Sequence, residues 1–426
     1  MIPRAVSRLA RLVASVFVLW SGAGAALELT IKDAETVAVQ KDPMIVKFQA
    51  GVAASMEEAI ADQALPDPRL KLGAMNLPLD GFSLTQEPMT QMVIGVQQML
   101  PSWGLLDLKH DAGLIKAEVH RAQAMTRALM VLRMVRKGWM DVYYYTHSQR
   151  LVKESQEVFS QLVKITQFQY RAGRGKQQDV VRAQLELSML QDREAMIEQQ
   201  REAAIANMEK WIGASVKTHT LSTEFPQLPE LPPIEELSKN VEFHPSVAVA
   251  KAQLGVARTK VAIAKAKYKP SFMLDVSYGW RGGYNTMGEM QTPRADFVSA
   301  MVSMDMPFFT SKRQDKRLNA RGHELNAASD AINNQRRELQ QILDTSYANW
   351  VRLGERMEFY QKTVLLQAAQ FSETSRKAYQ SRVSDFSELV KARLGELNNN
   401  LQALKIRTDR AKAHYDLQYI AGESSS

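Results

Sequence analysis

The chain has 426 residues, of which 45% are hydrophobic and 23% charged, with 54 Lys and Arg against 46 Asp and Glu. This hydrophobic content is too high for a disordered chain, and because basic and acidic residues are interleaved, no nucleic-acid-binding surface is expected. The sequence contains no Cys, which excludes disulfides, thiolate metal sites and a lipid anchor on Cys.

Residues 1–25 have the pattern of a secretory signal peptide. Three arginines precede an apolar stretch, and Ala23-Gly24-Ala25 forms a small-residue cleavage site. We therefore expect an exported protein whose mature chain begins at Ala26 or Leu27. Beyond the signal there is no run of 18 uncharged apolar residues, so no membrane-spanning helix is predicted.

The mature chain repeats one order of elements: a helix that begins at a proline, two short strands, a very long polar helix, a turn and a returning helix. Prolines of the first unit recur in the second at shifts of 202, 202 and 206 residues, as Pro43/Pro245, Pro68/Pro270 and Pro101/Pro307. Differences confined to loops are typical of a duplicated unit. We predict a first repeat at 26–213, an equatorial linker at 214–240, a second repeat at 241–421 and a disordered tail at 422–426.

Each repeat contains two predicted strands, at about 69–79 and 89–100 and at about 271–281 and 296–306. In the third strand, Phe272, Val276 and Trp280 belong to an apolar face, while Asp275 and Ser277 belong to a small or polar face. Four strands cannot close a membrane barrel, and open edges in lipid would leave backbone groups unpaired. We therefore expect a share of a barrel assembled from several chains. A small soluble sheet packed on helices is the alternative.

Two proline-free stretches, from Leu105 to about Tyr170 and from Ser311 to about Tyr379, predict helices about 100 Å long at about 1.5 Å per residue. Each ends at a turn, and returning helices are expected to follow from Lys176 and Asp385. The last helix carries apolar residues at alternating spacings of four and three, which is typical of a coiled coil. These helices indicate a long hollow tube below a small barrel.

Ten of the 21 methionines lie in the strand regions. One in each strand falls on the predicted lumen face, namely Met75, Met99, Met273 and Met301. Thioether sulfur suits soft ions such as Cu(I) or Ag(I), but Met is also a common apolar filler. No firm metal site is predicted. His244, which precedes Pro245 at a helix start, is expected to be structural rather than a metal ligand.

Several motifs resemble those of a known family. They are ALPDPRL at 64–70 with MNLP at 75–78, QDVVRAQ at 178–184, HP at 244–245, YKPSF at 268–272 and DMPFF at 305–309. Each motif is loose, but their order and doubling resemble the outer-membrane efflux proteins, the TolC-like channels. Within that family, the chain looks most like the branch that serves heavy-metal RND pumps.

The resemblance implies a mainly α fold with a small membrane β-barrel portion, in which a homotrimer closes a twelve-stranded barrel in the outer membrane and a helical conduit extends into the periplasm. It also implies docking to a periplasmic adaptor and an inner-membrane RND pump, contact with outer-membrane lipid, and no cofactor. We expect a passive exit duct for heavy-metal cations. Alternatives are a channel for multidrug efflux or type I protein secretion, and a non-pore periplasmic coiled-coil scaffold.

An enzyme is not expected. The seven histidines are scattered, and the sequence contains no His-Glu-x-x-His, no Gly-x-Ser-x-Gly and no phosphate-binding glycine loop. A scaffold would explain the long helices but not the alternating strands.

By resemblance, a gate lies at the periplasmic tip, with Asp179 and Tyr379 at latch positions and Glu388 and Lys391 facing the constriction. The adaptor-docking tip would comprise Gly173, Arg174, Gly175, Arg382, Val383, Ser384 and Asp385. Ser384 stands where a latch Arg is often found, and Lys391 where a second acid lines the aperture, so a strongly cation-selective acidic ring is not expected. These side chains could equally be solvated charges at helix ends.

Overall fold

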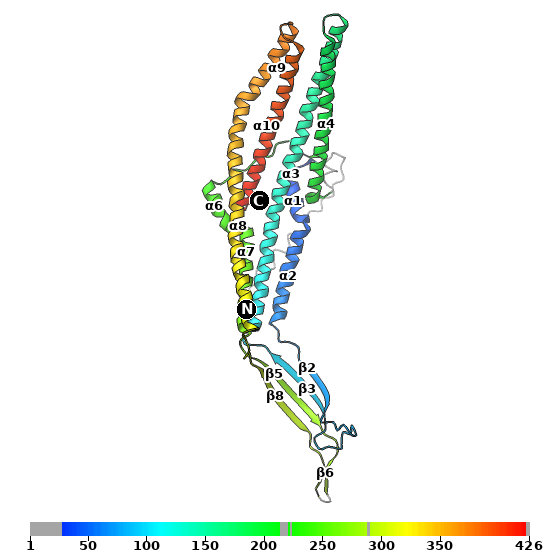
Figure 1. The fold of residues 1–426 in the computed structure, drawn as a ribbon, viewed down its shortest axis with the longest axis vertical. Coiled ribbons are helices and arrows are strands. Elements are labelled where there is room, and N and C mark those ends of the chain that lie inside the picture. The colour runs from blue at the N-terminus through cyan, green and yellow to red at the C-terminus, as the bar shows by residue number, and fades with distance from the viewer. Residues whose placement is uncertain (1–27, 214–219, 222–223, 288–289, 423–426) are drawn as a thin grey trace, which may run out of the picture.

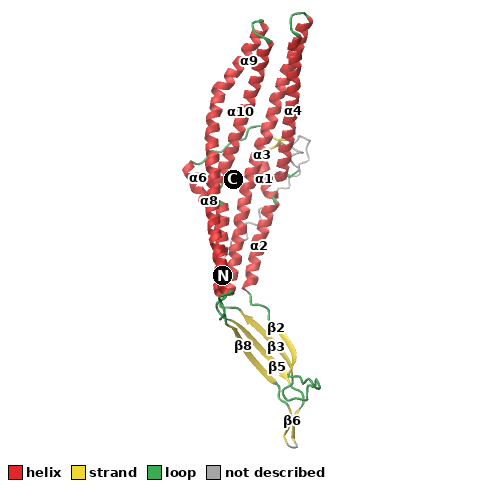
Figure 2. Ribbon diagram, in the orientation of Figure 1, coloured by secondary structure: helices red, strands yellow, loops and turns green. Residues whose placement is uncertain are grey.

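The computed structural model describes residues 28–213, 220–221, 224–287 and 290–422. The molecule is elongated, with a bundle of long helices at one end and a four-stranded sheet at the other (Figure 1, Figure 2). The predicted signal peptide and cleavage site lie outside the described residues, as do residues 423–426 of the predicted tail and residues 214–219 and 222–223 of the predicted linker.

The elements follow the predicted order. The first part of the chain contains β1 (Glu28–Leu29), α1 (Ile31–Lys41), α2 (Pro43–Gln63), β2 (Arg69–Met75), β3 (Gln91–Leu100), α3 (Leu105–Arg171) and α4 (Gln177–Ile212). The second part contains β4 (Thr220–Leu221), α6 (Ile234–Phe243), α7 (Pro245–Ala266), β5 (Ser271–Trp280), β6 (Tyr284–Met287), β7 (Met290–Pro293), β8 (Phe297–Asp305), α8 (Gln314–Phe359), a π-helical turn (Tyr360–Val364), α9 (Leu365–Gln380) and α10 (Phe386–Ala421).

The first long helix is confirmed, because α3 runs for 67 residues without a break. The second long helix is present from Gln314 to Gln380, but its α-helical pattern is interrupted, which was not predicted. Five residues of π-helix separate α8 from α9, and the helix changes direction there (Figure 1). A π-helical turn widens the backbone spacing locally and is often found where a long helix must bend. The returning helices α4 and α10 begin within one residue of the predicted positions.

The four predicted strands are present, and the first is shorter than predicted. It ends at Met75 because Asn76 has a φ of 55°, which an extended strand cannot contain. Two features were not predicted: the β6–β7 hairpin and the parallel pairing of β1 with β4. Helix α6 begins at Ile234, inside the segment predicted as a linker.

The two repeats start their proline-led helices with equivalent caps. Asp42 precedes Pro43 and accepts hydrogen bonds at 3.0 Å from the backbone N–H groups of Met44 and Ile45. In the second repeat, His244 Nδ1 accepts a hydrogen bond from the backbone N–H of Ser246 at 3.2 Å. Such caps satisfy amides that have no partner within the helix.

His244 has a second partner, since its Nε2 lies 3.1 Å from the carbonyl oxygen of Tyr419 at the end of α10. The imidazole is buried, and burial lowers its pKa to about 4, against the opposing effect of that carbonyl. His244 is therefore a neutral cap that joins α7 to α10, as the sequence led us to expect.

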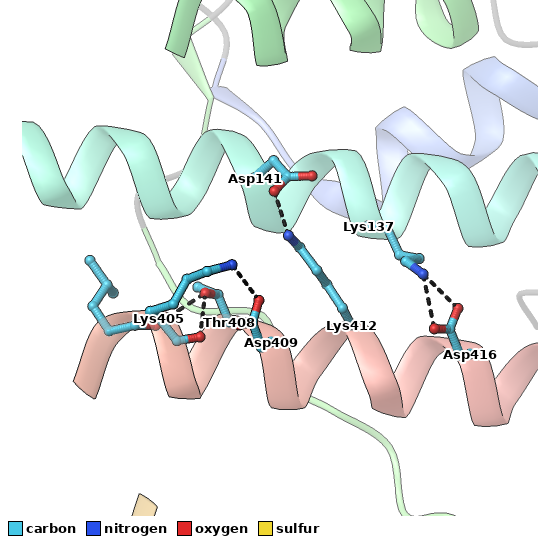
Figure 3. Close-up of polar contacts among 8 residues, drawn as sticks. Lys137, Asp141, Lys405, Thr408, Asp409, Lys412 and Asp416 are labelled. Atoms are coloured by element: carbon cyan, nitrogen blue, oxygen red, sulfur yellow. Dashed lines mark hydrogen bonds and ion pairs between the residues drawn. The ribbon is translucent and has the colours of Figure 1, made fainter. Parts of the chain in front are cut away.

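Ion pairs between α3 and α10 join the two repeats in the middle of the bundle (Figure 3). Lys137 Nζ lies 3.0 and 2.9 Å from the two carboxylate oxygens of Asp416, and Lys412 pairs with Asp141. Arg133 also binds Asp416, at 2.6 Å. Because these groups are partly buried, they fix how the two long helices lie against one another better than fully exposed pairs would.

The main sheet has the order β2-β3-β5-β8, and all neighbouring strands are antiparallel. β3 and β5 come from different repeats, so the sheet joins the repeats at this end of the molecule. β2 and β8 lie at the two edges, and neither has a second strand partner among the described residues. The sheet therefore presents two open edges.

Candidate functional site

One face of the sheet is apolar and exposed. On β5, the alternate side chains from Phe272 to Trp280 are all between 39% and 48% exposed, and on β8 Val298 and Val302 are 77% and 67% exposed. None of the described helices covers this face, because these helices stand beyond the ends of the strands (Figure 2). A continuous uncovered apolar sheet face is typical of a surface that meets lipid or a partner.

The opposite face of the sheet is polar, and its centre is an ion pair. Lys71 Nζ lies 3.2 Å from Asp275 Oδ2, and the side-chain amide of Gln97 donates to the same oxygen at 2.5 Å. These residues come from β2, β3 and β5, and the register places Gln97 directly opposite Asp275. The carboxylate is thus held by two donors on the face that the sequence predicted to be small or polar.

The four methionines predicted on that face lie there but do not gather. Met99 is paired directly with Met273. Met301 is opposite Asp275, which is the next residue after Met273 on the same face of β5. Met75 is opposite Gln91, at the other end of β3 from Met99, roughly 26 Å away at about 3.3 Å per residue. Four thioethers spread in this way do not form one ligand set. Among the described residues, no three His, Asp or Glu side chains are grouped closely enough to hold a metal ion.

The two turns at the far end of the bundle have the same backbone structure (Figure 1). The amides of Ala172, Gly173 and Arg174 donate to carbonyls of the last turn of α3, and the amides of the residues 209 positions later repeat these three bonds at the end of α9. The left-handed position is Gly173 in the first turn, with φ 69°, and Arg382 in the second, with φ 60°. A non-glycine residue there is strained.

The turns lie close together. A hollow of about 410 Å³ is lined by residues of both, including Arg174, Arg382 and Phe168, and the Phe168 side chain is 75% exposed. Val383 at the apex of the second turn is 82% exposed. The remaining predicted tip residues, Gly175, Ser384 and Asp385, complete the two turns. The end of the bundle therefore presents both arginine and uncovered apolar side chains.

Tyr379 joins the two helical hairpins just below these turns. Its hydroxyl donates to the side-chain oxygen of Gln169 on α3 at 2.8 Å, and its ring lies 5.6 Å from that of Phe386. Burial first, and then the negative charge of Asp179, raise the pKa of Tyr379, while the hydrogen bond to Gln169 opposes them. The phenol therefore stays protonated and can donate. Asp179, in the first turn of α4, lies near enough to act on it.

A second contact between the hairpins was not predicted. Arg182 of α4 donates to the hydroxyl of Ser387 on α10 at 2.6 Å. The sequence did carry one signal, because Arg182 occupies in the first repeat the position that Lys391 occupies in the second, 209 residues later. Nothing in the sequence distinguished Gln169 or Ser387 from other polar residues of long helices.

The other two predicted gate residues form a local pair. Lys391 Nζ lies 2.9 Å from Glu388 Oε1, one turn earlier in the same helix, and the two side chains are 64% and 49% exposed. An exposed pair of this kind contributes at most about 1 kcal/mol to stability. Both charges are free to face water, but neither joins the hairpins within one chain.

In the described part of the chain, none of the helices is long and apolar enough to cross a membrane.

Comparison with known proteins gives one family and several solved structures. The sequence profile of the outer membrane efflux proteins matches residues 36–214 and 237–423. CusC superposes with a TM-score of 0.77 at 14% identity, over 94% of this chain and 95% of that one. A membrane protein from Pseudomonas aeruginosa gives 0.78 at 14% identity, over 93% and 90%. The outer membrane protein VceC from Vibrio cholerae gives 0.75 at 15% identity, over 92% and 96%. No curated protein sequence matches the chain.

Proposed function

The chain belongs to the outer membrane efflux protein family, and we propose that three copies of it form a passive exit duct, with a twelve-stranded barrel in the outer membrane and a helical tube in the periplasm. The observation that carries this proposal is the sheet, which has two open edges, one exposed apolar face and one polar face. In lipid, every backbone group of a strand must find a partner. Edge pairing of β8 with β2 of the next chain satisfies this requirement.

The same sheet argues against a periplasmic scaffold without a pore. A scaffold built on the long helices would not require uncovered strands with exposed apolar side chains from Phe272 to Trp280. The polar face with Lys71 and Asp275 is suited to a water-filled lumen. The helical turns, 209 residues apart, then lie at the periplasmic end. Their exposed Phe168 and Val383, together with Arg174 and Arg382, offer a docking surface for a periplasmic adaptor, and through it for an inner-membrane RND pump.

We place the gate just below this docking surface. Tyr379 with Gln169, and Arg182 with Ser387, hold the two hairpins together within each chain. Asp179 acts on Tyr379, and Glu388 and Lys391 lie in the first turn and a half of α10. Opening the tube requires the hairpins to separate, so these contacts are the ones that opening must break.

Heavy-metal cations are the proposed cargo, and this part of the proposal depends on the resemblance of residues 64–78 to the heavy-metal branch of the family rather than on a ligand set. The test is a deletion strain exposed to a panel of toxic compounds. We expect the strain to become sensitive to a transition-metal cation at concentrations at which its sensitivity to detergents and dyes is unchanged. Sensitivity to detergents and dyes alone would favour the multidrug alternative, and loss of a secreted protein would favour type I secretion.

A further inference from the structure

A cavity of about 980 Å³ lies where the strands of the sheet meet the helices. Its walls come from α7, α8 and the start of α3, and from β3, β5 and β8. Figure 1 shows where these strands meet the helical bundle. Met99, Ser271 and Asp305 line it, and the register places these three side chains on the same sheet face as Asp275. In the proposed duct, the cavity therefore opens toward the lumen.

The lining of the cavity is strongly basic. It contains six basic residues, Lys260, Lys267, Lys269, Arg313, Arg317 and Arg321. It contains two acidic residues, Asp305 and Glu324, so that the balance is +4 in each chain. The whole chain of 426 residues has a net charge of only +8. The net charge around this one cavity is therefore half as large as the net charge of the whole chain.

Little of this charge is neutralised by the protein. Arg321 pairs with Glu324 at 2.5 Å, and Lys269 reaches only the carbonyl oxygen of Trp103, at 3.4 Å. Asp305 accepts a hydrogen bond from the Ser271 hydroxyl. Within the described residues, Lys267, Arg313 and Arg317 make no ion pair, although α8 carries several carboxylates farther along its length.

The basic side chains are held close enough together to repel one another. Arg317 and Arg321 are four residues apart along α8 and so lie on one face of the helix, where like charges destabilise each other. Arg313 is also the residue that precedes the first turn of α8. A helix N-terminus attracts anions and disfavours cations. An anion in the cavity would offset both effects, because its negative charge would lie beside the guanidinium groups and near the start of α8.

The remaining walls are apolar, with Leu105, Ile263, Ala264, Met306 and Pro307 among the lining residues. The volume is that of a site for a drug-sized molecule and is much larger than a simple inorganic anion requires. Arginine forks bind carboxylate, phosphate and sulfonate groups in two-point contacts. The site therefore combines an apolar wall with several anion-binding side chains.

We propose that this cavity binds organic polyanions, molecules with an apolar body that carry several acidic groups, and that it is a binding station on the exit path. The inference rests on the proposed duct for its place on that path. It also refines the cargo. A free metal cation is repelled by the +4 balance of each cavity, whereas a metal held in a complex with an organic polyacid carries the charge that the cavity attracts.

The test is fluorescence anisotropy of pyrene tetrasulfonate, a rigid polyanion, titrated with the purified full-length protein in a neutral detergent. We expect saturable binding of one dye per chain. Arg317→Gln should weaken it about tenfold, because the dye loses a charged two-point contact. Lys316→Gln is the matched control, since Lys316 is the exposed neighbour that does not line the cavity, and it should change the affinity by less than about twofold. Lys267→Gln and Lys265→Gln form a second matched pair at the end of α7.

Absence of saturable binding to the wild-type protein would overturn the inference. Equal weakening by Arg317→Gln and Lys316→Gln would do the same, because it would mean that diffuse surface charge attracts the dye. Binding is measured on the isolated protein and requires no transport. A trimer that does not bind the dye would thus reject only the cavity, whereas a protein that does not assemble would reject the duct.

Discussion

The double substitution Asp179→Ala with Tyr379→Phe is expected to raise the single-channel conductance in planar bilayers and to admit large antibiotics such as vancomycin into cells, without loss of the trimer. Tyr379→Phe removes the hydroxyl that donates to Gln169 at 2.8 Å, and Asp179→Ala removes the charge that acts on that hydroxyl. Each such contact contributes about 1 kcal/mol, or about a fivefold change in the ratio of closed to open states. Small contributions of this kind are suited to a gate that must open reversibly.

The matched control for the gate is Tyr170→Phe. Tyr170 occupies in the first repeat the position of Tyr379, 209 residues earlier, and its side chain is 47% exposed. Because its hydroxyl makes no hydrogen bond among the described residues, conductance should not change. If the double variant conducts like the wild-type protein while remaining trimeric, Asp179 and Tyr379 are not the latch.

The second large effect is expected at Arg136, in the middle of the bundle. Its guanidinium binds both carboxylate oxygens of Glu35 on α1, at 2.7 and 3.2 Å, and the side-chain oxygen of Gln418 on α10 at 3.0 Å. Both charged side chains are nearly buried, at 11% and 6% exposure. Arg136→Met would leave the Glu35 carboxylate buried without a cation, and loss of one partner of a buried pair costs about 3 to 5 kcal/mol.

Thermal unfolding of the purified protein, followed by circular dichroism, measures this loss. The control is Arg352→Met, because Arg352 pairs with Glu355 on an exposed helix face, at 76% and 59% exposure, and should contribute less than about 1 kcal/mol. Similar small shifts in the two variants would contradict the assignment of Arg136 as the ion-pair centre that ties α1, α3 and α10 together.

Much of the fold could be predicted because it depends on local sequence. The period-two alternation from Ser271 to Trp280 specifies a strand and both of its faces. The absence of proline between Leu105 and Arg171 permits one long helix. The repeat shift of 209 residues between Tyr170 and Tyr379 matches two turns whose backbone hydrogen bonds are the same.

The features that were missed have different causes. The π-helical turn at 360–364 contains neither Pro nor Gly, so no local signal marks it. β1 and β4 are two residues each and lie about 190 positions apart in the chain, too short and too distant for a pattern to reveal. Helix α6 is different, since Pro233 followed by Glu235 and Glu236 is a helix-start signal that the linker assignment overlooked.

The candidate site also has features that the sequence predicted and contacts that it did not. Resemblance pointed to Asp179 and Tyr379, but the Gln169 partner of Tyr379 and the contact of Arg182 with Ser387 depend on how the two hairpins pack. Alternation placed the strand methionines on one face, but only the register shows that Met75 lies far from Met99. The cavity at the junction was not predicted, because its basic side chains come from two helices and the segments that flank them, whose packing no sequence pattern specifies.

The central claim is that three chains complete one barrel, and the mass of the purified protein in a neutral detergent tests it most directly. Native mass spectrometry is expected to give three mature chains per particle, with the strand signal intact in circular dichroism, since the open edges of β2 and β8 require partners from other chains. A monodisperse single chain that retains its strands would contradict the account.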